Sequence, residues 1–151
     1  MTRRFRHYGQ DWEAQPLGAG VGAGFGNQPP AINIWGVAFK SLSSPTREPH
    51  VGSIPKPDVN QLTEQELQAS LDQALANAVF KALQDPQWDW RTVDGLAQEV
   101  GLPEDVVLQI IESAPDRVIR SRVPDARGRA LYTTRSHYRE RRGFWESFRS
   151  T

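Results

Sequence analysis

Cysteine is absent from this 151-residue chain. Without cysteine there is neither a disulfide framework nor a thiolate metal site. The three histidines, His7, His50 and His137, lie too far apart for the short spacing of metal-ligand pairs. The sequence also lacks the glycine-rich phosphate loop of nucleotide-binding proteins and the nucleophile elbow of hydrolases. We therefore expect no metal, no cofactor and no enzymatic activity.

Long apolar runs are missing as well. No stretch approaches the roughly eighteen apolar residues that a transmembrane helix needs. The basic start at Arg3, Arg4 and Arg6 is not followed by the apolar segment of a secretory signal. These two absences predict a cytoplasmic protein without a membrane span.

Net charge is zero, but this balance hides a strong segregation along the chain. Residues 61–116 carry two basic and eleven acidic side chains, whereas residues 117–151 carry ten basic and three acidic ones. A net charge of zero alone would argue against an anionic partner. The segregated charge, however, is compatible with such a partner at the basic end of the chain. It also permits self-association, with the acidic block of one copy against the basic block of the next.

Glycine and proline concentrate in the first sixty residues, and the helical apolar periodicity begins only after them. We therefore expect residues 1–60 to form a flexible or partner-ordered arm. Within it, the segment 31–39 has the pattern of a strand, with Trp35, Val37 and Phe39 on one face. We take these three as candidate partner-binding residues, because such a segment can order by adding a strand to a partner's sheet.

Three helices are expected before the basic block. The first begins at a capping box formed by Thr63 and Glu66 and continues as a leucine-rich stripe. Thr92 caps the second, and Gly101 provides its left-handed stop. Pro103 suits the first turn of the third helix.

Two β-type runs follow, at residues 118–123 and 129–134, on either side of a five-residue turn rich in proline, aspartate and glycine. This pattern predicts a two-stranded hairpin. With the helices before it, the hairpin would complete a folded domain over residues 61–136.

This order of elements resembles the winged helix-turn-helix superfamily over about residues 63–135. Residues 91–107 carry the resemblance, since Ala97, Gly101 and Leu102 stand where the family has a small residue, a turn glycine and an apolar residue. The resemblance implies an α+β fold: a small winged helix-turn-helix domain of three helices plus a β-hairpin wing, behind a Gly/Pro-rich N-terminal arm.

The third helix departs from the DNA-reading members of the superfamily. In those members it enters the major groove and offers cationic or amide side chains to the bases. Here its expected outward positions are Glu104, Asp105, Leu108, Gln109 and Glu112. The carboxylates would repel phosphates, and Gln109 alone has the chemistry of a base-reading side chain. The sequence therefore does not favour conventional groove insertion.

The hairpin is the better candidate for contact with nucleic acid or another anion. Its candidate residues are Arg120, Arg122, Arg127, Arg129 and Arg135, with Tyr132 available for stacking. Arg120 and Arg122 would point the same way on a regular strand and could straddle a phosphate backbone. Two alternatives stay open: the arginines protect an edge hairpin from aggregation, or they pair with the chain's own acidic helices.

Residues 137–151 form a basic tail with an aromatic cluster of Phe144, Trp145 and Phe148. Such a cluster is unfavourable in water, so we expect it to pack back on the domain, to dock on a partner or to touch an anionic membrane. These three side chains are also candidate partner-binding residues.

Two functions are compatible with these features. The favoured one is a non-catalytic winged-helix adaptor that mediates protein–protein interaction, supported by the acidic third helix and the aromatic arm and tail. The alternative is a nucleic-acid-binding transcriptional regulator that contacts DNA mainly through its basic wing, supported by the clustered arginines.

Overall fold

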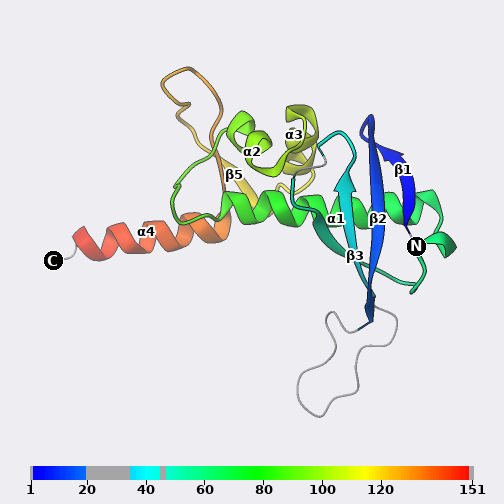
Figure 1. Cartoon of the computed structure of the whole chain (residues 1–151). Helices are drawn as coiled ribbons and strands as arrows, with labels where there is room; N and C mark the ends of the chain where they lie inside the picture. The colour runs from blue at the N-terminus through cyan, green and yellow to red at the C-terminus, as the bar shows by residue number, and fades with distance from the viewer. Residues whose placement is uncertain (1, 20–34, 45–46, 150–151) are drawn as a thin grey trace, which may run out of the picture. The chain divides into compact units, whose positions relative to one another are not determined.

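The structure is a computed structural model that describes residues 2–19, 35–44 and 47–149, with only the backbone described at 18–19 and from 143 onwards (Figure 1). The described part is mixed α+β, with four α-helices and two antiparallel sheets. It divides into two compact units, Met1–Ala76 and Asn77–Thr151, which we call the N-terminal and C-terminal units.

The N-terminal unit is built on a four-stranded antiparallel sheet in the order β1-β2-β3-β4. The strands are β1 (Arg3–His7), β2 (Gln10–Ala19), β3 (Trp35–Ser41) and β4 (His50–Ile54). A turn of Tyr8 and Gly9 joins β1 to β2, and both residues have positive φ, 53° and 68°. Tight two-residue hairpin turns of type I′ require this left-handed conformation at both positions.

One face of the sheet packs against helix α1 (Glu64–Leu83), which follows a short 3-10 helix, η1 (Val59–Gln61). On that face Phe5 is paired with Trp12 and Ala14 with Phe39, and all four side chains are buried. Strand β4 approaches the helix so closely that a Cβ at Gly52 would lie 3.3 Å from the Cβ of Ala74. Figure 1 shows the strands beside the N-terminal part of α1. This layer of sheet and helix is the core of the N-terminal unit.

The described part of residues 1–60 thus forms a sheet where the sequence predicts a loosely structured arm. The expected strand over 31–39 begins at Trp35, and residues 31–34 lie outside the described part. Val37 and Phe39 are 0% exposed, so they cannot serve as a partner-binding surface in this fold. Glycine and proline content reflects local chain preference, and here pairing between strands distant in sequence overrides it.

The helix ends occur where the capping signals predict them. Thr63 and Glu66 exchange both hydrogen bonds of the capping box, at 3.0 and 3.1 Å. The Thr92 hydroxyl accepts from the backbone N–H of Gly95, and Gly101 ends that helix with a φ of 76°. These helix boundaries are confirmed because each depends on residues within about four positions of one another.

The C-terminal unit contains the last part of α1 and five further elements. These are α2 (Val93–Val100), α3 (Glu104–Glu112), β5 (Val118–Arg120), β6 (Tyr132–Thr134) and α4 (Arg135–Arg149). Its core contains fully buried side chains from three helices: Val79 and Leu83 from α1, Leu96 from α2 and Val107 from α3.

The expected hairpin is present, with shorter strands and a longer loop than predicted. Strands β5 and β6 pair from Val118 with Thr134 to Arg120 with Tyr132, and residues 121–131 form the loop. Arg91 extends this small sheet, because its N–H and C=O both bond to Tyr132, at 2.8 Å each.

Helix α4 follows β6 directly, so the described residues hold four helices where three were expected. The hydroxyl of Thr134 accepts a hydrogen bond from the backbone N–H of His137 at 3.2 Å, as a helix cap does. The sequence interpretation missed this start because it assigned Thr134 to a strand alone. No helix in the described ranges combines the length and apolarity needed to cross a membrane.

Candidate nucleic-acid interface

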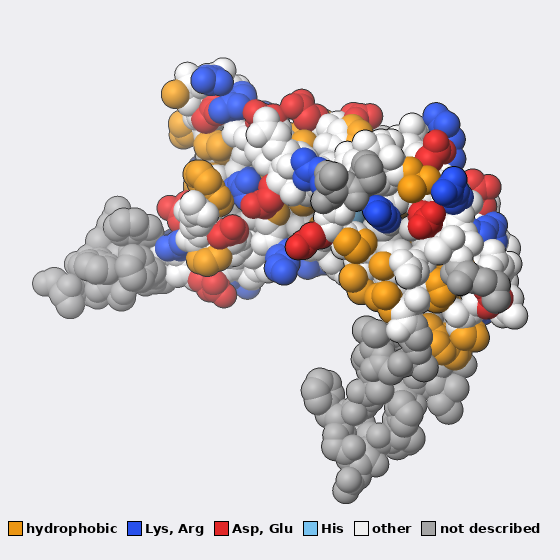
Figure 2. Space-filling view, in the orientation of Figure 1, with side chains coloured by type: hydrophobic (Ala, Val, Ile, Leu, Met, Phe, Trp, Pro, Cys, Tyr) orange, Lys and Arg blue, Asp and Glu red, His pale blue; other side chains and the backbone are white. Residues whose placement is uncertain are grey.

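The candidate arginines surround the loop between β5 and β6, which we call the hairpin loop (residues 121–131). The backbone N–H of Ser121 donates to the carbonyl of Leu131 at 2.8 Å and closes the base of the loop. At the tip, Gly128 has a φ of 79° and its N–H donates to the carbonyl of Asp125 at 2.9 Å. The loop therefore has a defined turn at its tip. Figure 2 shows Lys and Arg side chains gathered there, at the top left.

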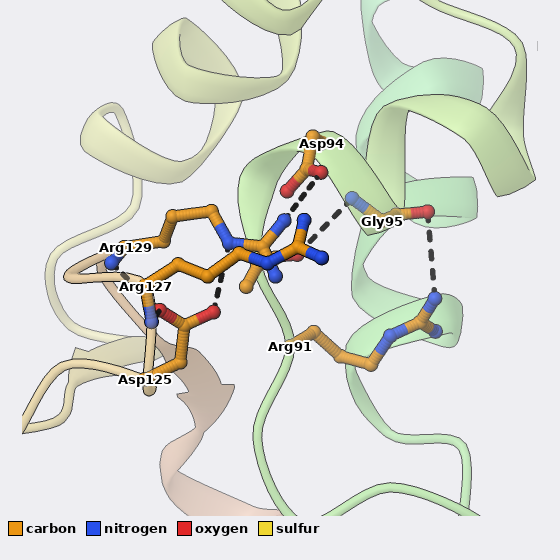
Figure 3. Close-up of polar contacts among 7 residues, drawn as sticks. Arg91, Asp94, Gly95, Asp125, Arg127 and Arg129 are labelled. Carbon is orange, nitrogen blue, oxygen red and sulfur yellow. Dashed lines mark hydrogen bonds and ion pairs between the residues drawn. The ribbon is translucent and has the colours of Figure 1, made fainter.

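Arg129 fastens this tip to helix α2 (Figure 3). Its guanidinium lies 2.7 Å from a carboxylate oxygen of Asp94 and 2.8 Å from one of Asp125. The second oxygen of Asp125 accepts from the backbone N–H groups of Arg127 and Arg129, at 2.9 and 2.8 Å. One arginine and two aspartates thus hold the loop against the first turn of α2.

Hydrogen bonds and, after them, the charge of Arg129 lower the pKa values of both aspartates. The pKa of Asp125 is lowered, first by the hydrogen bond from the backbone N–H of Arg129 and then by the side chain of Arg129. The pKa of Asp94 is lowered, chiefly by a hydrogen bond from Thr92 and further by the charge of Arg129. Both carboxylates therefore stay ionised, and available to Arg129, well into the acidic range.

The remaining arginines of the hairpin behave differently from Arg129. Arg117 lies over the ring of Phe80, with its guanidinium carbon 4.0 Å from the ring centre. Arg120, Arg122 and Arg127 are exposed, and no ion pair joins them to any residue of the described part. Pairing with the chain's own acidic helices, one of the alternatives left open by the sequence, therefore accounts for Arg129 and not for these three.

The expected alignment of Arg120 with Arg122 depends on a regular strand, and β5 ends at Arg120. Beyond it, Ser121 turns the chain: its hydroxyl donates to the carbonyl of Val123 at 2.8 Å and accepts from the N–H of Val123 at 3.1 Å. The alternation of a strand does not reach Arg122, so the two guanidinium groups need not share a face.

Tyr132 is not available for stacking, because it is 9% exposed and its backbone pairs with Arg91 at the base of the hairpin. Arg135 is exposed at the start of α4, and its N–H donates to the carbonyl of Arg117. Trp35 is half-buried at the start of β3. The remaining candidate side chains, Phe144, Trp145 and Phe148, belong to α4 and lie outside the description of side chains.

Helix α3 presents the surface that the sequence predicts. Four outward positions are exposed and one is half-buried: Glu104, Asp105, Gln109 and Glu112, and Leu108. The only amide among them is Gln109. A phosphate backbone laid along this helix would meet three carboxylates.

A cluster in the N-terminal unit escaped the sequence interpretation, which placed His7 in a solvated arm. The Nε2–H of His7 donates to Asp72 of α1 at 2.8 Å, and the hydroxyl of Tyr8 donates to the same oxygen. The pKa of Tyr8 is raised by burial first and then by Asp72. Asp72 lies 64 or 65 positions from its partners, so no motif in the sequence could have indicated this contact. The cluster ties the β1–β2 turn to α1.

Among the described residues, no three His, Asp or Glu side chains form a group that could hold a metal ion. Comparison with protein-family models, with curated proteins and with solved structures finds no match for the chain. The function must therefore be argued from the geometry of the hairpin loop and its surroundings.

Proposed function

We propose that the C-terminal unit is a winged helix-turn-helix domain that binds nucleic acid through its hairpin loop, as the wing, and not through α3. The order of elements supports this proposal. Helix α1 is followed by the strand-like residue Arg91, by α2 and α3 around the turn at Gly101, and by the β5–β6 hairpin. In helix-turn-helix proteins the recognition helix enters the major groove; here that helix is acidic, which leaves the hairpin loop as the cationic element of the unit.

The observation that carries the proposal is the difference between Arg129 and its neighbours. Arg129 is paired with Asp94 and Asp125 and fixes the loop. By contrast, Arg120, Arg122 and Arg127 are exposed, and none of them forms an ion pair with a carboxylate of the described part. Guanidinium groups on an ordered loop bind phosphate oxygens by paired hydrogen bonds, at a lower entropic cost than those on a flexible segment. Phosphates are therefore the partners that suit them.

The acidic surface of α3 limits how the nucleic acid is read. Phosphate contacts fix position but carry little sequence information, and base contacts would have to come from a helix that offers Gln109 alone. Binding should therefore be mostly electrostatic, with weak sequence preference and a steep dependence on salt.

Fluorescence anisotropy of a labelled duplex, titrated with the full-length protein at low and near-physiological salt, tests the proposal. We expect Arg120→Ala/Arg122→Ala to weaken binding about equally for unrelated duplex sequences and to lower the slope of log affinity against log salt by about 2, since each lost phosphate contact removes about one unit.

The matched control is Arg4→Ala/Arg6→Ala, which removes the same charge from exposed positions of the N-terminal unit. It should change affinity far less. Wild-type affinity in the hairpin variant would contradict the proposal, as would equal losses in both variants.

An adaptor function is the second candidate, and the carboxylates on the outward face of α3 favour it. They would suit a basic protein surface. A wild-type protein that binds no nucleic acid even at low salt would support this adaptor function over the proposed one.

A further inference from the structure

Two aromatic side chains of the C-terminal unit are exposed although aromatic rings are normally buried. Five large hydrophobic side chains are exposed in the described part: Leu17, Val51, Trp88, Val123 and Tyr138. Trp88 is 45% exposed and Tyr138 is 40% exposed. Trp88 lies in the segment between α1 and Arg91, and Tyr138 lies in the first turns of α4. With Trp90 they form what we call the aromatic cluster.

Contacts between α4 and this segment hold the rings in place. His137 is 4% exposed, and its Nε2–H donates to the carbonyl of Trp88 at 2.8 Å. Arg141 pairs with Asp89 at 3.1 Å. The rings of Trp90 and Tyr138 are in contact, with their centres 5.9 Å apart. The buried histidine and the ion pair therefore anchor the backbone that carries Trp88 and Trp90 to α4, which keeps these rings near Tyr138.

Cations surround these rings. The guanidinium of Arg91 lies 5.4 Å from the ring centre of Trp88, but it is buried and paired with Glu99 at 3.1 Å, so it supports the ring and offers no free charge. On α4, Arg135 lies three positions before Tyr138 and therefore on its face of the helix, and Arg139 follows it, both exposed. Residues 135–142 carry four arginines and one glutamate. Asp89 is paired with Arg141, so the exposed arginines near Tyr138 that no ion pair of the described part occupies are Arg135 and Arg139.

Exposed aromatic rings beside arginines suit a ligand that offers flat π faces and negative charge together. Unpaired bases on a phosphate backbone have both, whereas the bases of a duplex are already stacked on one another and cannot reach a surface ring. An apolar protein partner would leave Arg135 and Arg139, which no ion pair joins to a described carboxylate, without counter-charges. The chemistry of this surface thus favours single-stranded nucleic acid.

We propose that the aromatic cluster is a stacking site for unpaired bases, so that the C-terminal unit binds single-stranded nucleic acid as well as a phosphate backbone. This inference rests on the proposed function, since the hairpin loop would hold the same strand. The cluster leads directly into the hairpin: Arg91 follows Trp90 and pairs through its backbone with Tyr132 at the base of the loop.

The test measures the affinity of the full-length protein for three labelled probes: a single strand of mixed sequence, a strand of equal length without bases, and a duplex. We expect Trp88→Ala to weaken single-strand binding about tenfold, in line with the loss of one stacked base. Binding of the base-free strand and of the duplex should be unchanged. Trp88→Phe keeps a ring and should retain most of the affinity. Tyr138→Ala, at an exposed helix position, provides a second variant.

The outcomes separate this inference from the proposed function. If Arg120→Ala/Arg122→Ala weakens duplex binding while both aromatic variants bind the single strand as wild type does, the stacking site is overturned and the wing proposal stands. Equal losses for the base-containing and base-free strands would also overturn it, because a stacking site cannot matter to a strand without bases. If the wild-type protein binds none of the probes, both the stacking site and the wing proposal are overturned, and a protein would be the partner to test at the aromatic cluster.

Discussion

Tyr8 shows at the residue scale how one contact can hold an unfavourable backbone conformation. Its φ of 53° lies in the left-handed region, which bulky residues rarely adopt. The hydroxyl that donates to Asp72 and the adjacent ring of His7, 3.9 Å away between ring centres, secure the turn against α1. A hydrogen bond between residues 64 positions apart in sequence thus stabilises a backbone conformation that tyrosine does not favour.

We expect Tyr8→Phe to lower the free energy of unfolding by about 1 kcal/mol, because it removes the donor to Asp72 and keeps the ring. Chemical denaturation of the full-length protein measures this. The matched control is Tyr138→Phe, at an exposed tyrosine whose hydroxyl has no hydrogen-bond partner in the described part. Equal midpoints for wild type and Tyr8→Phe would show that the turn does not depend on the bond. Because the pKa of Tyr8 is raised in the folded protein, this contribution is fully present below about pH 10, the unfolded value, and is lost as the pH rises further through the folded value.

At the scale of elements, the hairpin loop depends on the ionised form of Asp125. The pKa of this carboxyl is lowered in the folded protein, so its stabilising effect is present above about pH 4, the unfolded value, and is lost as the pH falls through the folded value. Asp125→Ala should have the same local effect at neutral pH, since it removes the acceptor for Arg127 and Arg129.

Amide hydrogen exchange measures this effect directly. The exchange protection of the N–H groups of Arg127 and Arg129 should fall about tenfold in Asp125→Ala, a typical result of losing one hydrogen bond. Asp116→Ala, at an exposed aspartate near the hairpin in sequence, should leave it unchanged. Protection that persists in Asp125→Ala would contradict the role of this carboxylate.

The same elements show what the sequence could and could not predict. The capping box at Thr63 and the stop at Gly101 are local signals and stand where expected, whereas Pro103, expected in the first turn of the third helix, is its N-cap. The sheet of the N-terminal unit depends on pairs such as Ala14 with Phe39, which no local pattern encodes. Likewise the sequence identified the arginines of the hairpin but could not tell that Arg129 is tied to Asp94, 35 positions earlier. Such contacts follow from the packing of α2 against the loop.

At the scale of the whole molecule, the two units arrange their charged side chains differently, although the net charge of the chain is zero. In the N-terminal unit, exposed charges pair across neighbouring strands, as Arg4 does with Glu13 and Arg6 with Asp11. In the C-terminal unit, acidic residues lie on α3 while unpaired arginines lie at the hairpin loop. The candidate interface and the aromatic cluster therefore belong to the C-terminal unit alone, and damage to the other unit should spare nucleic-acid binding.

Trp12→Ala tests this separation in the full-length protein. Trp12 is 1% exposed in the core between the sheet and α1, and losing a buried tryptophan side chain costs about 3–5 kcal/mol. Hydrogen exchange should therefore accelerate in β2 and β3 and stay slow in α2 and α3, while duplex affinity changes less than about twofold. Leu96→Ala, in the core of the C-terminal unit, should give the reverse pattern and lose binding. If Trp12→Ala instead accelerates exchange equally in both units, the chain unfolds as one cooperative structure, and the nucleic-acid interface depends on the sheet as much as on its own helices.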